Sequence, residues 1–341
     1  LPMEFARSRP NLILGVPRVF EKLYNAASQK AESANPVTAG IFRAASKTAV
    51  EYSKALDTPQ GPGRILTAKR KMYSRLVYDR IRDGIGGSVK YCITGGSAMS
   101  HDLLHWFRGI GVPVYEGYGL TEVAAAAAVD FENQKIGTVG PPVGGVTIRI
   151  NDEGEVCIKG DIVFKGYWNN PEATEAAIQD GWYNTGDLGE ILDSGHLIIT
   201  GRKKDLIVTA GGKNVSPGPM EDGLRSHPLI SQAMVVGDGK PFVGLLLTLD
   251  DEVLERWKLD HHIDKNTSIK DLSADPTLRA EIQDAINDVN STVSHAERIK
   301  KFYILDSDLT EEDNELTPTM KVKRYVVAQR YADAIDQLYS R

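Results

Sequence analysis

The first 85 or so residues have the hydrophobic spacing of helices. After Pro17, apolar residues recur at intervals of one, three and four positions: Val19, Phe20, Leu23 and Tyr24. This is the spacing of an amphipathic helix with proline in its first turn. A second helix is predicted over residues 37–56, and a Pro- and Gly-rich segment at 59–63 ends it.

A third predicted helix, over residues 64–82, is strongly basic. Its apolar positions are Ile65, Leu66, Met72, Tyr73, Leu76, Val77 and Ile81. Its cations are Arg64, Lys69, Arg70, Lys71, Arg75, Arg80 and Arg82. Such a helix can lie on a membrane surface, so peripheral membrane contact is one interpretation. The favoured interpretation is a helix packed against the core with a solvated cationic face.

From Ser88 the pattern changes to alternating strands and helices. A strand over 89–94 ends at Gly95-Gly96-Ser97, a helix follows over 101–108, and a short strand is predicted at 112–115. Between 135 and 200, short β runs (147–150, 155–158 and 197–200) alternate with Gly, Asn and Asp turns, which indicates a small barrel or a twisted sheet.

After Gly201 the pattern is that of a compact α+β unit. Strands are predicted at 206–209, 232–236, 242–249 and 302–305, with helices at 277–293 and from about 322. We therefore expect a domain boundary near residues 201–205.

Composition narrows the class of protein. The 341 residues suffice for two or three domains, and a net charge of −6 argues against a general nucleic-acid binder. The two cysteines, Cys92 and Cys157, lie in apolar runs and are expected to be buried free thiols. No apolar run approaches the ~20 residues of a membrane span, and no secretory signal opens the sequence, so we expect a cytoplasmic protein.

Candidate chemistry begins with the string from Tyr115 to Glu122. The glycines on either side of Tyr118 allow a sharp turn and leave an aromatic face on which a planar base can stack. Thr121 can donate to a phosphate, and Glu122 can hold Mg²⁺ through oxygen. The alternative is an ordinary strand-to-helix turn with a capping threonine. Because Gly95-Gly96-Ser97 also follows a strand, both loops are expected at one edge of a sheet.

Two further segments contain candidate binding residues. Asp187, after Thr185-Gly186, can accept hydrogen bonds from two vicinal hydroxyls of a ribose, although an Asx-turn is an equal alternative. Arg202 can contact ribose or phosphate, or form an ion pair with Asp205. The run from Leu316 to Arg324 contains Lys321 after a rigid turn, and read alone it is a solvated charge cluster.

These motifs, in this order, resemble the adenylate-forming superfamily of acyl- and aryl-CoA synthetases, luciferases and peptide-synthetase adenylation domains. The matching strings are Tyr118–Glu122, Tyr183–Asp187, Gly201–Pro217 and the Lys321 segment. Three features resemble the long-chain fatty-acyl-CoA synthetase branch in particular. They are the amino-acid sequence of residues 316–324, that of residues 15–22 near the start of the chain, and the helical insertion before Ser88.

The resemblance implies an α/β fold: the C-terminal part of a large α/β plus β-barrel domain, followed by a small α+β domain. Residues 1–203 would form the first part, with a helical insertion at 1–87, an α/β region at 88–134 and a barrel-like region at 135–200. Residues 204–341 would form a mobile domain that swivels at Lys204.

The implied activity is a two-step ligation that uses ATP, Mg²⁺ and coenzyme A. A fatty carboxylate attacks the α-phosphate of ATP to give acyl-AMP, and the CoA thiol then displaces AMP. The residues implied around the adenine are Gly95, Gly96, Ser97, Glu116, Gly117, Tyr118 and Gly119. Thr121 would contact phosphate, and Glu122 would ligate Mg²⁺. Asp187 would hold the ribose hydroxyls, and Arg202 would lie beside them.

Residues of the second domain would alternate between the two steps. Lys321 would neutralise the carboxylate and the α-phosphate in the first step. Rotation at Lys204 would then bring Gly211 and Lys213 to the pantetheine of CoA.

The sequence departs from the family at one point. The Ser/Thr/Gly-rich phosphate loop that ends in Pro-Lys-Gly is not found in these 341 residues. The chain is therefore expected to be the C-terminal portion of a longer synthetase, and a catalytically silent folded fragment is one alternative. A fatty acyl-AMP ligase that loads a carrier protein is another. The alanines from Ala124 to Ala128 could leave room for an acyl tail or simply favour a helix.

Overall fold

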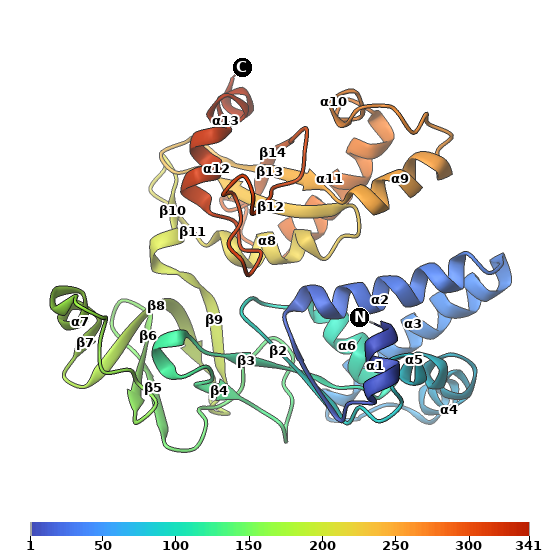
Figure 1. Ribbon diagram of the computed structural model, residues 1–341, viewed down its shortest axis with the longest axis horizontal. Helices are drawn as coiled ribbons and strands as arrows, with labels where there is room; N and C mark the ends of the chain where they lie inside the picture. Colours follow the sequence, from blue (N-terminus) through green and yellow to red (C-terminus); the bar gives the residue numbers. More distant parts are fainter. Residues whose placement is uncertain (1, 341) are drawn as a thin grey trace. The chain divides into compact units, whose positions relative to one another are not determined.

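The protein, seen here as a computed structural model, is described over residues 2–340 (Figure 1). It forms two compact units that meet in sequence between Ile199 and Thr200.

The first unit begins with the predicted helical region. Its helices are α1 (Pro2–Ser8), α2 (Pro17–Glu32), α3 (Pro36–Leu56), α4 (Arg64–Tyr73) and α5 (Asp79–Gly84), and a π-helical turn (Ser74–Tyr78) joins the last two. The helices predicted after Pro17 and over 37–56 are confirmed. The side chain of Asn35 caps α3 by accepting from the amide of Thr38 at 2.8 Å. The expectation that this region is mainly helical overlooked one strand, β1 (Leu12–Gly15), which is too short to show a period.

A four-stranded sheet follows, in the order β1-β2-β3-β4. Strands β2 (Tyr91–Gly95) and β3 (Val114–Tyr118) are parallel to β1, and β4 (Ala128–Val129) is antiparallel to β3. Helix α6 (His101–Ile110) makes the crossover from β2 to β3.

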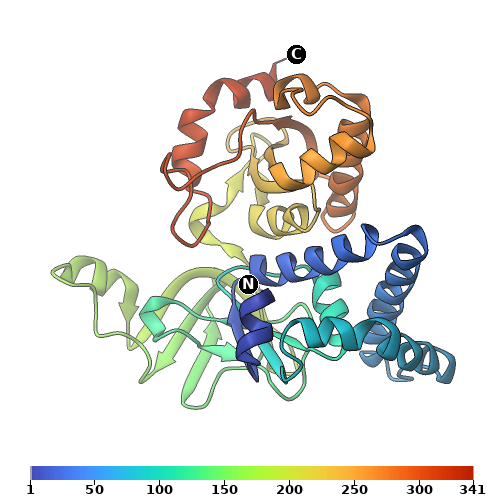
Figure 2. The same ribbon diagram turned by 45° about the vertical axis from the view of Figure 1, so that its right-hand side comes forward.

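The two faces of this sheet differ. One face contributes Ile13, Cys92 and Val114 to the helical core, and all three are almost fully buried. On β1 the other face exposes apolar side chains, with Leu14 75% and Leu12 46% exposed. In both views the helices α2–α5 lie on one side of the sheet's strands and the second sheet of this unit lies on the other (Figures 1 and 2).

The second sheet is antiparallel and has five strands. They are β5 (Val146–Ile150), β6 (Glu155–Gly160), β7 (Ile178–Gln179), β8 (Trp182–Ile191) and β9 (Leu197–Arg202). The order is β5-β6-β8-β7, with β9 also pairing with β8, and helix α7 (Pro171–Ala177) precedes β7. The strand order is that of an open sheet, with β5 and β7 at its ends.

The second unit packs a three-stranded sheet between two apolar layers. The sheet contains β12 (Ile230–Val236), β13 (Val243–Leu249) and β14 (Ile299–Ile304), next to a small hairpin of β10 (Ile207–Val208) and β11 (Asn214–Val215). Its helices are α8 (Pro217–Arg225), α9 (Asp251–Asp260), α10 (Ile269–Leu272), α11 (Pro276–Asn290), α12 (Arg324–Arg330) and α13 (Ala332–Tyr339).

Strands β12 and β13 are buried along their whole length because both faces are covered. Ala233 and Val235 point into the layer that includes α8 and α11, while Met234 and Val236 point into the layer of α12 and α13. This is the period-two alternation of a strand. The predicted strands and the helix over 277–293 are confirmed, and the helix predicted from about 322 is present as α12 and α13, whereas α8, α9 and α10 were not predicted.

Both cysteines are buried free thiols, as predicted. Cys92 is 1% exposed on β2, and burial raises the pKa of its thiol to about 12. Cys157 is fully buried on β6. Within the described part of the chain, no helix combines the length and the apolarity that crossing a membrane requires.

Candidate functional site

The two predicted loops leave the first sheet at the same edge. In the register of β2 and β3, Gly95 lies opposite Gly117 and Thr94 opposite Glu116, and both strands run in the same direction. Glu116 also links the loops directly, because its Oε1 accepts a hydrogen bond from the amide of Met99 at 3.0 Å. The expectation of a shared edge is therefore confirmed, and such an edge is where open α/β sheets bind ligands.

Tyr118 connects the first sheet to the second. It is the last residue of β3, and its hydroxyl donates to Oδ2 of Asp187 at 2.6 Å. The two residues are 69 positions apart in sequence, and Asp187 is only 3% exposed. The fold thus joins the two motifs through one buried, charge-assisted hydrogen bond.

The expected open face of Tyr118 is wrong in this structure. The residue is 8% exposed because its ring packs in a cluster with Val123 and Ala127. A base that stacks on Tyr118 would first have to displace these neighbours. The ring instead positions its hydroxyl against the carboxylate of Asp187.

The backbone around Asp187 is fixed by three hydrogen bonds. The amide of Gly186, at φ +73°, donates to Oε1 of the buried Glu155 at 2.7 Å. Thr185 Oγ1 donates to the carbonyl of Val156 at 2.8 Å and accepts from the amide of Asp187 at 3.1 Å. Asp187 therefore lies within a strand, β8, in a rigid position rather than in a loose turn.

Glu122 is the second carboxylate of the predicted site. It is part of a 3₁₀ turn (Thr121–Val123), and its Oε1 accepts from the hydroxyl of Tyr167 at 3.1 Å. The pKa of Tyr183 is raised. Burial is the largest cause, and the negative charges of Glu122 and Asp187 add to it. Tyr183 thus lies near both carboxylates, and Thr121 is exposed beside them.

Gly119 and the alanine run form a tight loop rather than a helix. A Cβ at Gly119 would lie 1.4 Å from the carbonyl oxygen of Ala125, so only glycine fits there. Ala124 and Ala125 have φ values of 52° and 93°, which no α-helix contains. The suggestion that helix propensity explains these alanines is therefore wrong.

Glu122 fits a magnesium site that is completed by the phosphates of a nucleotide and by water. Among residues 2–340, no group of three or more His, Cys, Asp or Glu side chains could hold a metal ion by itself. Mg²⁺ commonly uses one or two carboxylates, several waters and the phosphates of its nucleotide. Glu122, half-buried beside the exposed Thr121, matches that requirement.

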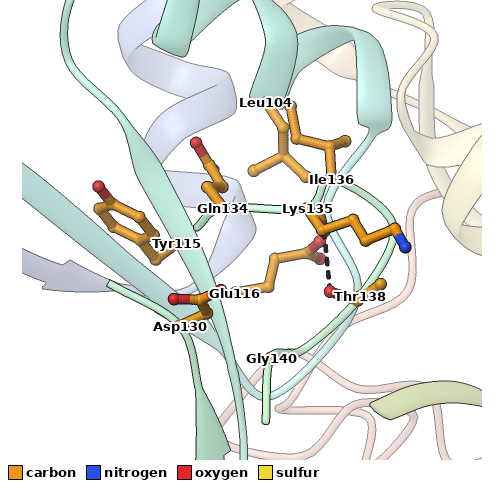
Figure 3. A pocket seen from close by; sticks show the side chains of 9 residues that line it. All are labelled: Leu104, Tyr115, Glu116, Asp130, Gln134, Lys135, Ile136, Thr138 and Gly140. Atoms are coloured by element: carbon orange, nitrogen blue, oxygen red, sulfur yellow. Dashed lines mark hydrogen bonds between the residues drawn. The ribbon is translucent and has the colours of Figure 1, made fainter. Parts of the chain in front are cut away.

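A small pocket lies beside Glu116 (Figure 3). Its lining side chains come from α6, β3 and the segment 130–140: Leu104, Tyr115, Glu116, Asp130, Gln134, Lys135, Ile136 and Thr138. Nε2 of His196 lies 2.8 Å from Oδ2 of Asp130, and the amides of Glu132 and Asn133 donate to the other oxygen of Asp130. Burial alone would raise the pKa of Asp130, but these hydrogen bonds outweigh it and lower the pKa.

The remaining predicted residues follow the boundary between the two units, which falls inside β9. Arg202 ends β9, and Lys204 lies in a 3₁₀ turn (Lys203–Asp205) between β9 and β10. Gly211 lies in the turn that closes the β10–β11 hairpin, and Nζ of Lys213 lies 3.4 Å from Oε1 of Glu297.

Lys321 lies on an exposed, well-defined turn. The amide of Thr317 donates to its carbonyl at 2.8 Å, and its own amide donates to Oγ1 of Thr317 at 3.0 Å. Met320, at φ 63°, makes the turn, and Leu316 and Val322 pair across it. Thr317 therefore holds the backbone of Lys321 through two hydrogen bonds, so the turn presents this residue in a defined place.

Sequence reasoning missed four residues that lie around Asp187 and Glu122. Tyr183 and Thr185 lie in the same motif as Asp187 and could have been included with it. Glu155 and Tyr167 had no such signal, because only the fold brings Glu155 to Gly186 and Tyr167 to Glu122.

Comparison with known proteins agrees with this arrangement. Residues 3–168 match the family described as AMP-binding enzyme, and residues 204–341 match the AMP-binding enzyme C-terminal domain. The chain belongs to the AMP-binding, adenylate-forming enzyme family. The resemblance stated from the motifs is thus confirmed, and it extends to the long-chain branch.

Curated relatives of the chain include two long-chain-fatty-acid–CoA ligases. The chain is 51% identical to FadD15 of Mycobacterium bovis, over 100% of its own length and 56% of the relative. It is 35% identical to ACSBG2 of Gallus gallus, over 97% of its own length and 46% of the relative. The chain therefore spans about half the length of the curated relatives it matches.

Solved structures share the fold. The adenylation domain of a carboxylate reductase from Mycobacterium chelonae superimposes with a TM-score of 0.71 at 22% identity, over 99% of this chain and 48% of that one. O-succinylbenzoate coenzyme A synthetase from Bacillus subtilis, in complex with AMP, superimposes with a TM-score of 0.54 at 27% identity. The match covers 70% of this chain and 46% of that one. The same enzyme is known with ATP and a magnesium ion. The predicted fold class, an α/β adenylation fold with a smaller C-terminal domain, is confirmed.

Proposed function

We propose that this chain carries the nucleotide and coenzyme A part of an ATP-dependent long-chain fatty acid–CoA ligase. The observation that supports this most is the hydrogen bond from Tyr118 to Asp187, which unites two family motifs at the ligand-binding edge of the sheet. The proposed substrate class is supported by the 51% identity to the long-chain-fatty-acid–CoA ligase FadD15.

The proposed reaction has two steps. A carboxylate oxygen of the fatty acid attacks the α-phosphorus of ATP, the bond to the bridging oxygen breaks, and pyrophosphate leaves. The thiolate of coenzyme A then attacks the acyl carbon, and AMP leaves as the thioester forms.

The side chains of the first unit would bind the nucleotide. The loops of Gly95–Ser97 and Glu116–Gly119 would border the adenine, and Thr121 would donate to a phosphate. Glu122 would ligate Mg²⁺, whose positive charge would reduce the repulsion between the two anionic substrates. Asp187 would accept from the ribose hydroxyls, and the side chains that now cover this carboxylate would have to move aside.

The second unit would supply the groups that change between steps. Lys321, on its exposed turn, would neutralise the carboxylate and α-phosphate as they meet. After a swivel at Lys204, Gly211 and Lys213 would instead border the pantetheine arm. Arg202, at the end of β9, would serve the ribose or the phosphates.

The test measures the two steps separately in a version of the enzyme that carries out both. Replacing Lys321 by alanine should lower pyrophosphate release at least about a hundredfold, as removal of one charge-stabilising group does. Thioester formation from supplied acyl-AMP should stay within about twofold. Lys300→Ala, an exposed lysine of the same unit, is the matched control. An equal loss in both steps would contradict the role of Lys321.

A second candidate is a folded but catalytically silent chain. It is favoured by the absence of a Pro-Lys-Gly phosphate loop from these 341 residues. Calorimetric titration with AMP, followed by a pyrophosphate assay on this chain, distinguishes the two. Binding without pyrophosphate release supports the silent chain, and release excludes it. If acyl-AMP forms but free coenzyme A yields no thioester, a carrier-protein ligase becomes the better proposal.

A further inference from the structure

The basic helical segment of residues 64–82 has an inner face that is fixed to the first unit. Nε of Arg70 donates to the carbonyl of Gly109 at 2.7 Å, and Nη1 of Arg82 donates to that of Ile110 at 2.6 Å. These carbonyls end α6, where cations complement the helix dipole. The hydroxyl of Tyr78 donates to the carbonyl of Ala45 on α3 at 2.7 Å. The segment is therefore firmly attached, and two of its seven cations have a structural role.

The outer face of the same segment exposes a stripe of aliphatic side chains. Ile65 is 76% exposed, Met72 50% and Leu76 51%. Their spacing of seven and four residues places them on one side of a helix, along about 16 Å of its axis. The five remaining cations are all exposed: Arg64, Lys69, Lys71, Arg75 and Arg80.

Acidic side chains contribute little to this surface. The only acid between residues 64 and 82 is Asp79, and it pairs with Arg82 and accepts from Ser74. Asp83 follows just beyond the segment. Seven cations and one acid give these 19 residues a net charge of +6, although the whole chain carries −6. The patch is therefore a local concentration of positive charge on an acidic protein.

We propose that the outer face of residues 64–80 docks on the surface of a bilayer that contains anionic phospholipid. Aliphatic residues in the middle of a cationic helix face are the pattern of helices that lie in a membrane interface. Lysine and arginine at their flanks extend their charged ends to the headgroups while their methylene stems stay with the apolar layer. A nucleic acid would complement the cations but leave the three aliphatic side chains in water. This proposal is independent of the proposed ligase activity.

The charge part of the proposal is tested by vesicle co-sedimentation of the 341-residue chain. Vesicles of phosphatidylcholine alone are compared with vesicles that also contain phosphatidylglycerol. Each cation near an anionic surface strengthens binding about fivefold, so Lys69→Glu, Lys71→Glu and Arg75→Glu together should weaken it at least about a hundredfold. The matched control places the same three charge reversals at Lys265, Lys270 and Lys300, and it should change binding by less than about threefold.

The apolar part is tested by Met72→Ser with Leu76→Ser, against Val37→Ser with Leu259→Ser as the control. All four residues are at least half exposed, so these changes leave the core intact. The first pair should weaken binding at least about tenfold without changing its dependence on salt, and the second pair should not weaken it.

A site-specific probe makes the proposal testable without any loss of charge. In Met72→Cys, a polarity-sensitive fluorophore would label the new thiol because Cys92 and Cys157 are buried. Its emission should shift to the blue on vesicles that contain phosphatidylglycerol, and the same probe at Val37→Cys should not shift. The proposal is overturned by equal binding to phosphatidylcholine alone, by equal effects of patch and control variants, or by an unshifted probe at position 72. Self-association or nucleic-acid binding through this face, with no binding to vesicles, would also overturn it.

Discussion

Replacing Tyr118 by phenylalanine removes one hydroxyl from the contact that joins the two sheets of the first unit. The ring keeps its shape and its packing, so the change isolates the 2.6 Å hydrogen bond to Asp187. Hydrogen bonds to charged groups contribute about 1.5–3 kcal/mol, and here the acceptor is a carboxylate that is only 3% exposed. We therefore expect the free energy of unfolding of the first unit to fall by about 2 kcal/mol. With a urea m-value of about 3 kcal/mol/M, the midpoint moves down by about 0.7 M.

The assay is equilibrium unfolding in urea, followed by tryptophan fluorescence. Trp106, Trp168 and Trp182 report on the first unit, and Trp257 reports on the second. Tyr325→Phe is the matched control, because Tyr325 is 80% exposed on α12 and should give a change within about 0.5 kcal/mol. If Tyr118→Phe and Tyr325→Phe shift the first-unit transition equally, the hydroxyl has no special partner and the reasoning fails.

Three further predictions concern other parts of the chain. Burial, and then the charge of Arg108, lower the pKa of His105 to about 4. Between about pH 6.5 and 4, the unfolded state therefore binds a proton at His105 and the folded state does not. The free energy of unfolding should fall as the pH drops through this window, by at most about 1.4 kcal/mol per pH unit. His105→Gln should reduce this pH dependence in urea titrations. Gly119→Ala should cost about 3 kcal/mol or more through its clash with Ala125, whereas Gly144→Ala, which meets open space, should stay within about 0.5 kcal/mol; equal thermal stability of the two variants would contradict the packing described here. Lys204→Pro fixes φ at the proposed swivel and should slow one half-reaction at least about tenfold more than the other, and parallel assays of pyrophosphate and thioester would show whether it does.

Most of the regular structure was predictable because its signals are local. The helix after Pro17 shows its period within a few residues, and so do the paired strands of the second unit. Strand β1 has only four residues, and its partner β2 lies about 80 positions away, so nothing local marks it. The π-helical turn at Ser74–Tyr78 likewise divides a segment whose pattern predicts one continuous helix.

The candidate site was predictable as far as its motifs are contiguous. The sequence placed Gly95 and Gly117 at one sheet edge, and their register agrees. It could not show that Tyr118 is buried, because the apolar cluster that covers it also needs distant residues such as Ile158 and Leu197. Nor could it show that Tyr167 donates to Glu122, since a hydrogen bond between residues 45 positions apart leaves no trace in local spacing.

The two buried cysteines have a practical consequence. A thiol reacts as its thiolate, and with a pKa of about 12 Cys92 forms almost none at neutral pH while it stays buried. Cys92 lies in the helical core and Cys157 in the second sheet of the first unit, and the second unit contains no cysteine. The rate at which a thiol reagent modifies the native protein therefore reports on transient opening of the first unit alone. Mass spectrometry of the two cysteine peptides would measure separately how fast the helical core opens at Cys92 and how fast the second sheet opens at Cys157. It needs no engineered label.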